Sequence, residues 1–366
     1  MTICVIATAS AYRGALMIYK QFLDALEIYH GEDDWHVFVD YGMPMPQIEH
    51  VNYHVCHTKG FGRIWFDMVG FCREVKRLKI VPDVIVSLQN TGVYCHCERI
   101  VVYYHQSLPL YHYKFKLLEK AAFSNLFYSY FYPLYVRLFL NKRTFIAVQT
   151  NTIKKLFSEK FGFPKDKIGV YFPKVEKIDT MSVMPYQYDG GTYNFLYPSM
   201  GASYKEHITL PIAVRILKER NPELVNRIRI HFTVDKNGMK DVWTYIVHND
   251  LECNFVFHGN IPHKQVMSML KGSNGLLFPS VVESSGLPLL EAAMLGVPII
   301  ANDMGYVHDA LHEYEGVMCV QVHDYDEWAT KIEECCKREA HCSPYLFNDN
   351  NSWGRLFRLI KEGVVE

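Results

Sequence analysis

Hydrophobic residues in the first half of the chain form short, mostly apolar runs, which alternate with longer segments whose apolar residues recur at helical spacing. The short runs predict buried strands, and the helical spacing predicts amphipathic helices. The predicted strands cover residues 3–7, 35–40, 52–56, 84–88, 100–104 and 145–150. The predicted helices cover residues 15–29, 65–78 and 152–161. This alternation is typical of a parallel sheet with helices on both faces.

The same alternation starts again in the second half, after a stretch without sustained periodicity. That stretch, residues 171–191, contains two prolines and a Gly-Gly pair, which is typical of a boundary between domains. The strands predicted beyond it cover residues 194–197, 228–233, 254–258, 276–278, 299–301 and 317–322. The helices predicted there cover residues 207–219, 242–248, 262–270, 288–295 and 327–337.

The chain of 366 residues is long enough for two domains of moderate size, and we expect both to be doubly wound α/β units. We predict an N-terminal domain over residues 1–172, a linker over residues 173–191 and a C-terminal domain over residues 192–345. The last segment, residues 346–366, contains an amphipathic helix that we expect to pack back on the first domain.

The segment between residues 276 and 302 predicts a strand, a tight loop, a helix and a second strand. Ser284, Ser285 and Gly286 form a small-residue turn, and Pro288 stands in the first turn of the helix. The first N–H groups of a helix have no partner within the helix, and they lie at the positive end of its dipole. A small-residue loop that leads into such a helix suits a phosphate group.

Two glutamates accompany this loop, Glu283 before the turn and Glu291 on the helix. Because a carboxylate repels a phosphate, we expect both to accept hydrogen bonds from sugar or ribose hydroxyls. Lys205 lies in the first strand-to-helix loop of the same domain, so it should project from the same edge of the sheet. A cation there would complement a diphosphate. The alternative is an exposed lysine at a helix start, which the helix dipole disfavours.

Three further candidates follow predicted strands. Gly14 is the only glycine in the loop after the first strand, so the G-x-G-x-x-G motif of dinucleotide-dependent oxidoreductases is missing. It either lets a ligand approach the backbone or is a plain turn glycine. His105 ends a buried strand, and it either faces the site or is a satisfied core histidine. Gly259, Asn260 and Ile261 follow a third strand and could approach a flat base with backbone groups.

Composition narrows the classes of function. Hydrophobic residues make up 49% of the chain, which is enough for two cores. The 38 lysines and arginines nearly balance the 39 aspartates and glutamates, which gives a net charge of -1. We therefore expect no nucleic-acid partner, and an anionic partner must meet a local basic patch.

The ten cysteines show neither a regular disulfide framework nor paired CxxC motifs, so we expect reduced thiols. Cys95, His96 and Cys97 are neighbours, but adjacent ligands alone do not build a tetrahedral metal site. The N-terminus leads straight into a strand without the regions of a signal peptide. No apolar run reaches the roughly 20 residues of a membrane-spanning helix. We expect a protein on the cytoplasmic side.

Aromatic and basic residues are interleaved between residues 105 and 144. The aromatic residues are Tyr111, Tyr113, Phe115, Phe123, Phe127, Tyr128, Tyr130, Phe131, Tyr132, Tyr135 and Phe139. The basic residues are Lys114, Lys116, Lys120, Arg137, Lys142 and Arg143. This composition on helical segments suits peripheral contact with the headgroups of an anionic membrane. The alternative is a tyrosine-rich core with a solvated basic face.

Together these features resemble the retaining glycosyltransferases of the GT-B fold, in the group 1 or family 4 class that uses nucleotide sugars. The most specific match is the pair of Glu283 and Glu291, separated by seven residues as in the family and followed by the G-x-P of residues 296–298. The sequences YPS, YKEH, FHGNIPHKQVMSMLKGS and GRLFRLIKE extend the resemblance over nearly the full length. It implies two Rossmann-like domains that face each other across a cleft.

The resemblance also implies roles for the candidate residues in the second half. Glu283 would bind the hydroxyls of the donor sugar, and Glu291 would hold the ribose hydroxyls. Lys205 would neutralise the leaving diphosphate. The diphosphate would be bound by Ser284, Ser285, Gly286 and Leu287, the last three through backbone N–H groups.

In the first half, the resemblance places Gly14 under the phosphates and His105 against the donor sugar. One position departs from the family. Many members carry an arginine six residues before the lysine, and Ser199 stands there in this chain. Stabilisation of the diphosphate would then rest on Lys205 and backbone amides, or on another basic residue such as Arg13.

The mechanism implied by the resemblance is front-face transfer with retention, in which the leaving diphosphate helps to activate the acceptor hydroxyl. No protein nucleophile is needed, and stabilising the departing charge is the main catalytic effect. The sequence contains no Asp-x-Asp metal motif, so we expect no metal and no cofactor.

Three hypotheses follow. The first is a glycosyltransferase that acts on a lipid-linked or saccharide acceptor, such as a precursor of lipopolysaccharide O-antigen or capsule. The second is an enzyme of the same fold, a nucleotide-sugar epimerase or a phosphorylase, which the glutamate spacing disfavours. The third is a catalytically silent partner that binds sugar nucleotides, and Ser199 in place of arginine keeps this hypothesis open.

Overall fold

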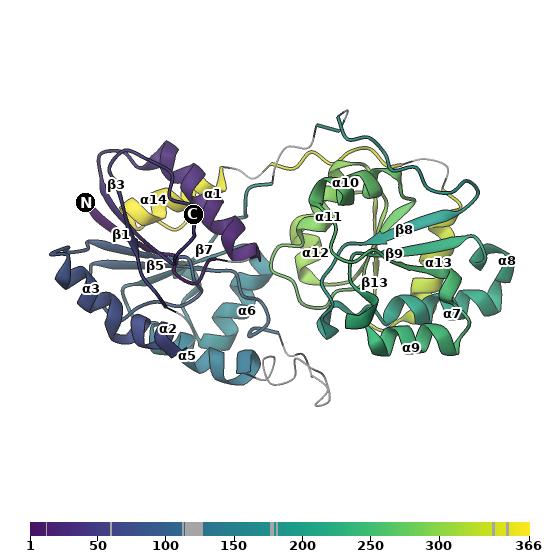
Figure 1. The fold of residues 1–366 in the computed structure, drawn as a ribbon, viewed down its shortest axis with the longest axis horizontal. Helices are drawn as coiled ribbons and strands as arrows, with labels where there is room; N and C mark the ends of the chain where they lie inside the picture. Colours follow the sequence, from purple (N-terminus) through teal and green to yellow (C-terminus); the bar gives the residue numbers. More distant parts are fainter. Residues whose placement is uncertain are drawn as a thin grey trace. The chain divides into compact units, whose positions relative to one another are not determined.

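The structure is a computed structural model that divides the chain into two compact units (Figure 1). It describes residues 1–11, 13–58, 61–111, 113, 127–175, 179–180, 182–338, 341–348 and 351–366. For Arg13 and Phe61 it describes the backbone alone. The first unit comprises Met1–Val175 and Asn348–Glu366, and the second comprises Glu176–Phe347.

The first unit is built on a parallel sheet of seven strands in the order β3-β2-β1-β4-β5-β6-β7. Its strands are β1 (Thr2–Ile6), β2 (Asp34–Val39), β3 (Val51–Val55), β4 (Val84–Ser87), β5 (Arg99–Tyr104), β6 (Thr144–Val148) and β7 (Ile168–Val170). Its α-helices are α1 (Arg13–Tyr29), α2 (Phe61–Trp65), α3 (Phe71–Arg77), α5 (Tyr132–Leu138), α6 (Asn151–Phe161) and α14 (Ser352–Glu362). Its shorter helical segments are the π-helical η1 (Phe66–Gly70) and η2 (Phe127–Phe131) and the 3-10 turn η3 (Lys165–Lys167).

Helices cover both faces of this sheet because its strands are apolar on both sides. Successive side chains of a strand point to opposite faces. Ile3 and Val5 of β1 therefore pack with α1 and α14, whereas Cys4 and Ile6 pack with α3, α5 and α6. Figure 1 shows α1 and α14 together on one side of the sheet and α2, α3 and α5 on the other.

The C-terminal helix α14 returns to the first unit, as predicted. Its residues Trp353 and Phe357 are buried, and the Phe357 ring stacks on Phe22 of α1 with ring centroids 5.3 Å apart. The Trp353 ring stacks on Tyr103 of β5 with centroids 5.9 Å apart. These aromatic contacts join the last helix of the chain to the core formed by the first strands.

The second unit repeats the architecture with six parallel strands in the order β10-β9-β8-β11-β12-β13. Its strands are β8 (Tyr193–Tyr197), β9 (Ile228–Phe232), β10 (Phe255–Phe257), β11 (Gly275–Phe278), β12 (Ile299–Asn302) and β13 (Val317–Val320). Its helices are α7 (Thr209–Arg220), α8 (Pro222–Val225), α9 (Lys240–His248), α10 (His263–Gly272), α11 (Leu287–Met294), α12 (Gly305–Ala310) and α13 (Tyr325–Cys336). Short 3-10 turns are η4 (Ser203–Lys205), η5 (Lys236–Gly238) and η6 (Glu252–Asn254).

The two predicted doubly wound sheets are thus confirmed, with three local differences. The helix predicted over residues 65–78 is divided into α2, the π-helical η1 and α3. The short elements β7, α8 and α12 were not predicted, because three to six residues carry too little periodicity to be recognised. The boundaries of the units also fall at Val175 and Phe347, whereas a separate linker was expected over residues 173–191.

Part of that expected linker instead packs on the second unit. The Tyr186 N–H donates to the Ser268 carbonyl at 2.9 Å, and the Tyr188 hydroxyl donates to the Met269 carbonyl at 3.1 Å. Both acceptors lie on α10. A stretch without helical or strand periodicity is therefore held in place by individual hydrogen bonds.

Candidate active site

The loop after β11 is shaped by contacts with α12. The Tyr306 hydroxyl donates to the Ser280 carbonyl at 2.7 Å, and Tyr306 is fully buried. Gly286 ends the loop with φ +63°, in the left-handed region that favours glycine. A Cβ at Gly286 would lie 2.9 Å from Leu289 and 3.2 Å from the Tyr306 ring. Glycine is therefore favoured where the predicted diphosphate loop meets the helix.

Helix α11 begins at Leu287, as the small-residue turn predicted. Pro288 occupies its first turn, where its missing N–H costs no helical hydrogen bond. Ser285 is buried, and Ser284 is half-buried. The loop residues predicted to bind a diphosphate thus lie together at the N-terminus of one helix.

The structure brings Lys205 and Glu283 together as an ion pair. Lys205 ends the 3-10 turn η4 after β8, and its ammonium contacts Glu283 Oε1 from the loop after β11. Only 12% of the Lys205 side chain and 15% of the Glu283 side chain are exposed. The Tyr197 hydroxyl fixes the turn by donating to the Lys205 carbonyl at 2.6 Å. Lys205 thus offsets the negative charge of the Glu283 carboxylate in a place largely shielded from water.

Ser199, at the position where many family members carry arginine, contacts a histidine. Its Oγ lies 2.7 Å from His207 Nε2, and its N–H donates to Thr233 Oγ1 at 3.1 Å. Burial, with a smaller effect from the charge of Lys205, lowers the pKa of His207 to about 3. His207 is therefore neutral near pH 7 and brings no positive charge in place of the arginine.

Glu291 also has a partner that the sequence did not indicate. His263, the first residue of α10, places its Nε2 2.8 Å from Glu291 Oε1. The Glu291 side chain is 18% exposed, whereas the His263 side chain is 65% exposed. The two residues are 28 positions apart, so only the packing of α10 against α11 brings them together.

Gly259, Asn260 and Ile261 follow β10 at the carboxyl edge of the second sheet, where α/β folds bind their ligands. Gly259 has φ +69°, and its N–H donates to the Val234 carbonyl at 3.2 Å. A Cβ there would lie 2.9 Å from the carboxylate of Asp235. Gly259 is buried, whereas Asn260 is exposed at the edge.

The remaining candidates lie in the first unit. Gly14 is exposed in the first turn of α1, and an added Cβ would meet none of the described atoms within 4 Å beyond its own helix. The fold itself therefore does not require glycine there. Arg13 is the first residue of α1, and its side chain lies outside the described part of the structure.

His105 follows β5 and is held by Asn90, which has φ +68°. The His105 N–H donates to Asn90 Oδ1 at 2.6 Å, and the Asn90 amide nitrogen lies 3.4 Å from His105 Nε2. Burial, with a smaller effect from the positive charge of Arg63, lowers the pKa of His105 to about 4. Among the described residues, His105 Nδ1 is buried without a hydrogen-bond partner. A neutral imidazole with an unsatisfied nitrogen suits hydrogen bonding to a ligand hydroxyl.

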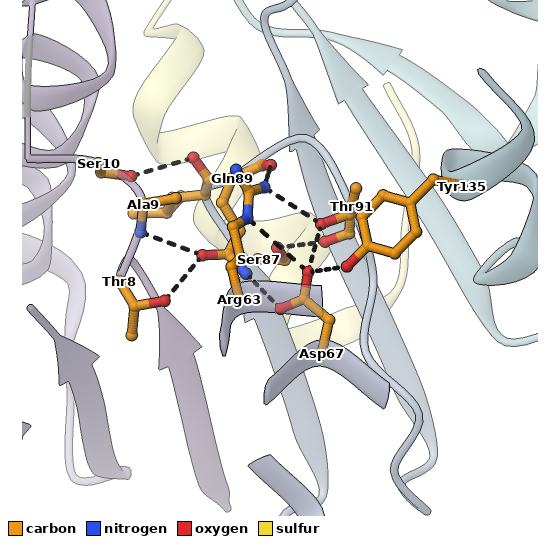
Figure 2. Close-up of polar contacts among 10 residues, drawn as sticks. Thr8, Ala9, Ser10, Arg63, Asp67, Ser87, Gln89, Thr91 and Tyr135 are labelled. Atoms are coloured by element: carbon orange, nitrogen blue, oxygen red, sulfur yellow. Dashed lines mark hydrogen bonds and ion pairs between the residues drawn. The ribbon is translucent and has the colours of Figure 1, made fainter. Parts of the chain in front are cut away.

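A polar network missed by the sequence analysis lies beside these residues (Figure 2). Its centre is Asp67 of η1, whose side chain is fully buried. The carboxylate accepts hydrogen bonds from Gln89 at 2.8 Å, Thr91 at 3.1 Å and the Tyr135 hydroxyl at 2.6 Å, and Arg63 lies 3.9 Å away. Burial raises the pKa of Asp67.

Gln89 connects this network to the loop after β1 (Figure 2). Its side-chain oxygen accepts hydrogen bonds from Thr8 Oγ1 at 3.2 Å and from the Ala9 N–H at 3.3 Å. The Arg63 guanidinium donates to the Gln89 carbonyl at 2.7 Å. The network therefore fixes the strand-end loop that leads to Gly14.

A comparison with known protein families finds a match in the second unit. Residues 189–345 match the family described as glycosyl transferases group 1. A D-inositol 3-phosphate glycosyltransferase of Pseudarthrobacter chlorophenolicus is 21% identical over 179 residues. That match covers 47% of this chain and 43% of the relative, so the chain matches less than half of the relative's length.

Solved structures match over both units. WaaG, a glycosyltransferase involved in lipopolysaccharide biosynthesis, aligns with a TM-score of 0.65 and 10% identity, covering 99% of this chain and 100% of its own. HepE from Anabaena, solved with UDP and glucose, aligns with a TM-score of 0.63 and 14% identity, covering 98% of this chain and 95% of its own. A glycosyltransferase of Rickettsia africae aligns with a TM-score of 0.64 and 15% identity, covering 92% and 88%. The chain therefore has the GT-B fold, and its residues 189–345 are similar to the group 1 glycosyltransferases.

Proposed function

We propose that this protein is a retaining glycosyltransferase that moves a sugar from a nucleotide-diphosphate sugar to a lipid-linked or saccharide acceptor. The observation that carries the proposal is the half-buried Lys205–Glu283 pair beside the glycine-terminated loop that opens α11. A cation, a hydroxyl-binding carboxylate and helix N–H groups at one sheet edge suit the three parts of such a donor.

In this proposal, each group of the loop has one role. The N–H groups of Ser285, Gly286 and Leu287 bind the diphosphate, with Ser284 beside them. Glu283 accepts hydrogen bonds from the sugar, and Glu291, held by His263, accepts them from the ribose. Binding of the diphosphate shares the charge of Lys205 between the diphosphate and Glu283.

The transfer follows from stabilisation of the leaving group. As the bond between the sugar and the diphosphate breaks, negative charge accumulates on the diphosphate oxygens, and a positioned cation stabilises that charge. Lys205 supplies the cation, because Ser199 and the neutral His207 supply none. His105, also neutral, acts as a hydrogen-bonding group for the sugar. We propose that the transfer needs no metal and no protein nucleophile.

We further propose a role in the synthesis of lipopolysaccharide O-antigen or capsule. Two solved structures of the same fold, WaaG and the lipopolysaccharide outer core galactosyltransferase WaaB, are named for lipopolysaccharide synthesis. Because HepE was solved with UDP-glucose, UDP-sugars are the first donors to test.

Exposed apolar side chains of the first unit support peripheral membrane contact on the cytoplasmic side. We call them the apolar surface. They are Ile64, Trp65, Met68 and Val69 of α2 and η1, and Phe127, Tyr130, Phe131, Leu134 and Leu138 of η2 and α5. The hydrogen bond from Tyr135 to Asp67 joins α5 to η1, so the two groups are neighbours.

The apolar surface includes Phe127, Tyr130 and Phe131, which are exposed aromatic residues in the described part of the aromatic and basic stretch. Arg137, Lys142 and Arg143 are exposed near it in sequence, whereas Tyr132 and Phe139 are buried in the core. Residues 112 and 114–126 of that stretch lie outside the described residues. No helix in the described part of the chain is long and apolar enough to span a bilayer. The contact that we propose is interfacial, with rings among the lipid headgroups and cations near their phosphates.

The ion pair can be tested with two variants and a matched control. We expect Lys205→Ala to lower turnover about 100- to 1,000-fold, which is the usual cost of losing one group that stabilises developing charge. Glu283→Gln should weaken donor binding by losing acceptor capacity for the sugar. Lys264→Ala, at an exposed lysine of α10, should change neither.

The measurements are thermal shift with UDP-, GDP-, CMP- and dTDP-sugars, followed by turnover of the donor that binds. A ligand that binds only the folded protein raises its unfolding temperature. Wild-type turnover in Lys205→Ala would contradict the site assignment. Donor binding without turnover in the unmodified protein would instead favour the catalytically silent sugar-nucleotide-binding partner.

A further inference from the structure

Three side chains of the second unit converge near its edge strand β13, and the proposed transfer uses none of them. They are Asp303, His308 and Cys319, whose ligating atoms all lie within 4.8 Å of one another. Asp303 follows β12, His308 lies on α12 and Cys319 lies on β13. The fold thus gathers a carboxylate, an imidazole and a thiol from three separate segments.

The strand register explains why these residues meet. Ala301 of β12 stands opposite Cys319 of β13. Because alternate residues of a strand share a face, Asp303 continues the face of Ala301, and Gln321 continues that of Cys319. The Gln321 amide donates to Asp303 Oδ2 at 2.7 Å, while His308 Nε2 lies 2.6 Å from Asp303 Oδ1. Both carboxylate oxygens of Asp303 are therefore held in place, Oδ2 by Gln321 and Oδ1 next to the His308 imidazole.

We propose that Asp303, His308 and Cys319 form a binding site for a borderline divalent cation of the Zn²⁺ type. Thiolate sulfur, imidazole nitrogen and carboxylate oxygen are the ligands that Zn²⁺ prefers. The cation takes the place of the hydrogen bond between Asp303 and His308, and Cys319 releases its thiol proton to solvent on binding. A water molecule completes four-fold coordination.

The surroundings suit such a site. Gln321 on the second carboxylate oxygen is the kind of outer hydrogen bond that orients a metal ligand. The His308 side chain is 63% exposed and that of Asp303 is 35% exposed, so a hydrated ion can reach both. A single cation would tie α12 to the edge strand β13.

This tie would reach the predicted diphosphate loop through α12. Tyr306 on α12 donates to the Ser280 carbonyl, and its ring lies where it would meet a Cβ at Gly286. Fixing α12 therefore supports the loop that precedes α11. The site is structural, so it does not conflict with a transfer that needs no metal.

The test uses the full chain, treated with a chelator and then titrated with Co²⁺ as a spectroscopic probe. We expect a thiolate-to-cobalt absorption band that saturates at one equivalent, disappears on addition of Zn²⁺ and is accompanied by a higher unfolding temperature. Cys319→Ser should lose the band. Cys253→Ser, at an exposed cysteine, should keep it and serves as the matched control.

Absence of the cobalt absorption band from the unmodified protein would overturn the proposal. Persistence of the band in Cys319→Ser would overturn it as well. His308→Ala provides a second variant at a mostly exposed position, where loss of folding is not expected. It should weaken Co²⁺ binding at least tenfold, whereas His312→Ala, at another exposed histidine, should leave binding unchanged. Equal binding by these two variants would also overturn the proposal.

Discussion

At the scale of single residues, the predicted chemistry depends on charges and protonation states that burial sets. Lys205 and Glu283 form a half-buried pair, which salt screens less than an exposed pair. His105 and His207, both largely shielded from water, are kept neutral because burial disfavours the imidazolium. Near pH 7, these two histidines can donate or accept hydrogen bonds, but they cannot neutralise a diphosphate.

The neutral histidines predict how stability depends on pH. Burial lowers the pKa of His207 to about 3 and the pKa values of His105 and His231 to about 4. An unfolded histidine titrates near pH 6.5, roughly, so between these values the unfolded chain binds more protons than the folded chain. Their contribution to the free energy of unfolding is therefore complete above about pH 6.5 and is lost as the pH falls toward 4.

Urea unfolding over this pH range checks the prediction. The denaturation midpoint should fall as the pH is lowered from about 6.5 to about 4. His207→Asn should make that fall shallower, because one of the three neutral histidines is removed. A midpoint that rises on acidification would show that these groups are protonated in the folded protein.

Several important residues could not be found from the sequence, because their significance is non-local. Asp67 reads as an ordinary acidic residue in an amphipathic segment, yet it is fully buried and accepts hydrogen bonds from residues 22, 24 and 68 positions away. His263 reads as an exposed helix residue, and its link to Glu291 spans 28 positions. By contrast, Glu283, Glu291 and Lys205 could be proposed from the sequence because local loop and helix signals marked their segments.

At the scale of elements, apolar runs predicted the strands well because parallel strands are buried on both faces. All residues of β4, β11 and β12 are buried, and these runs were found almost to the residue. The π-helical η1 was missed because five residues with i→i+5 hydrogen bonds are too short a segment to be told from the α-helical pattern on either side. Its effect is nevertheless specific, since η1 carries the buried Asp67.

The loop that opens α11 gives a prediction at this scale. Gly286→Ala places a Cβ at φ +63° and 2.9 Å from Leu289, so we expect a loss of stability of about 1–2 kcal/mol. Donor affinity should fall as well, because the loop N–H groups move. Gly190→Ala is the control, since a Cβ there meets none of the described atoms within 4 Å.

Thermal unfolding and donor titration of the two glycine variants provide the measurement. The predicted order of stability is wild type and Gly190→Ala together, with Gly286→Ala lower. If Gly286→Ala bound donor as the wild type does, the loop would not be part of the donor site.

At the scale of the whole molecule, the two-unit fold was predictable because the same alternation of strands and helices occurs twice. The return of α14 was also predictable, since an amphipathic helix at the end of the chain needs an apolar surface to cover. The division of the aromatic stretch into core and surface was not predictable. Tyr130 and Tyr132 are the same residue type in the same aromatic stretch, so the sequence does not distinguish them. In the structure, Tyr132 is 5% exposed and Tyr130 is 67% exposed.

The apolar surface predicts binding to anionic vesicles. Leu134→Asp should weaken binding about tenfold, because it replaces an apolar side chain with a charge that lipid headgroups repel. Leu346→Asp, at an exposed leucine of the second unit, is the matched control and should have no effect. Co-sedimentation with phosphatidylglycerol vesicles at low salt measures both, and equal binding by the two variants would contradict a membrane role for this surface.

The central claim is that the Lys205–Glu283 edge transfers a sugar from a nucleotide donor with retention of configuration. Proton NMR of a reaction with an α-linked nucleotide sugar tests it most directly, because the anomeric coupling of the first-formed product reports its configuration. We predict that the unmodified protein consumes the donor and forms an α-configured product. Lys205→Ala should lose both the consumption and the product, whereas Lys264→Ala should behave as the wild type does. A β-configured product, or donor consumption that is unchanged in Lys205→Ala, would contradict the account.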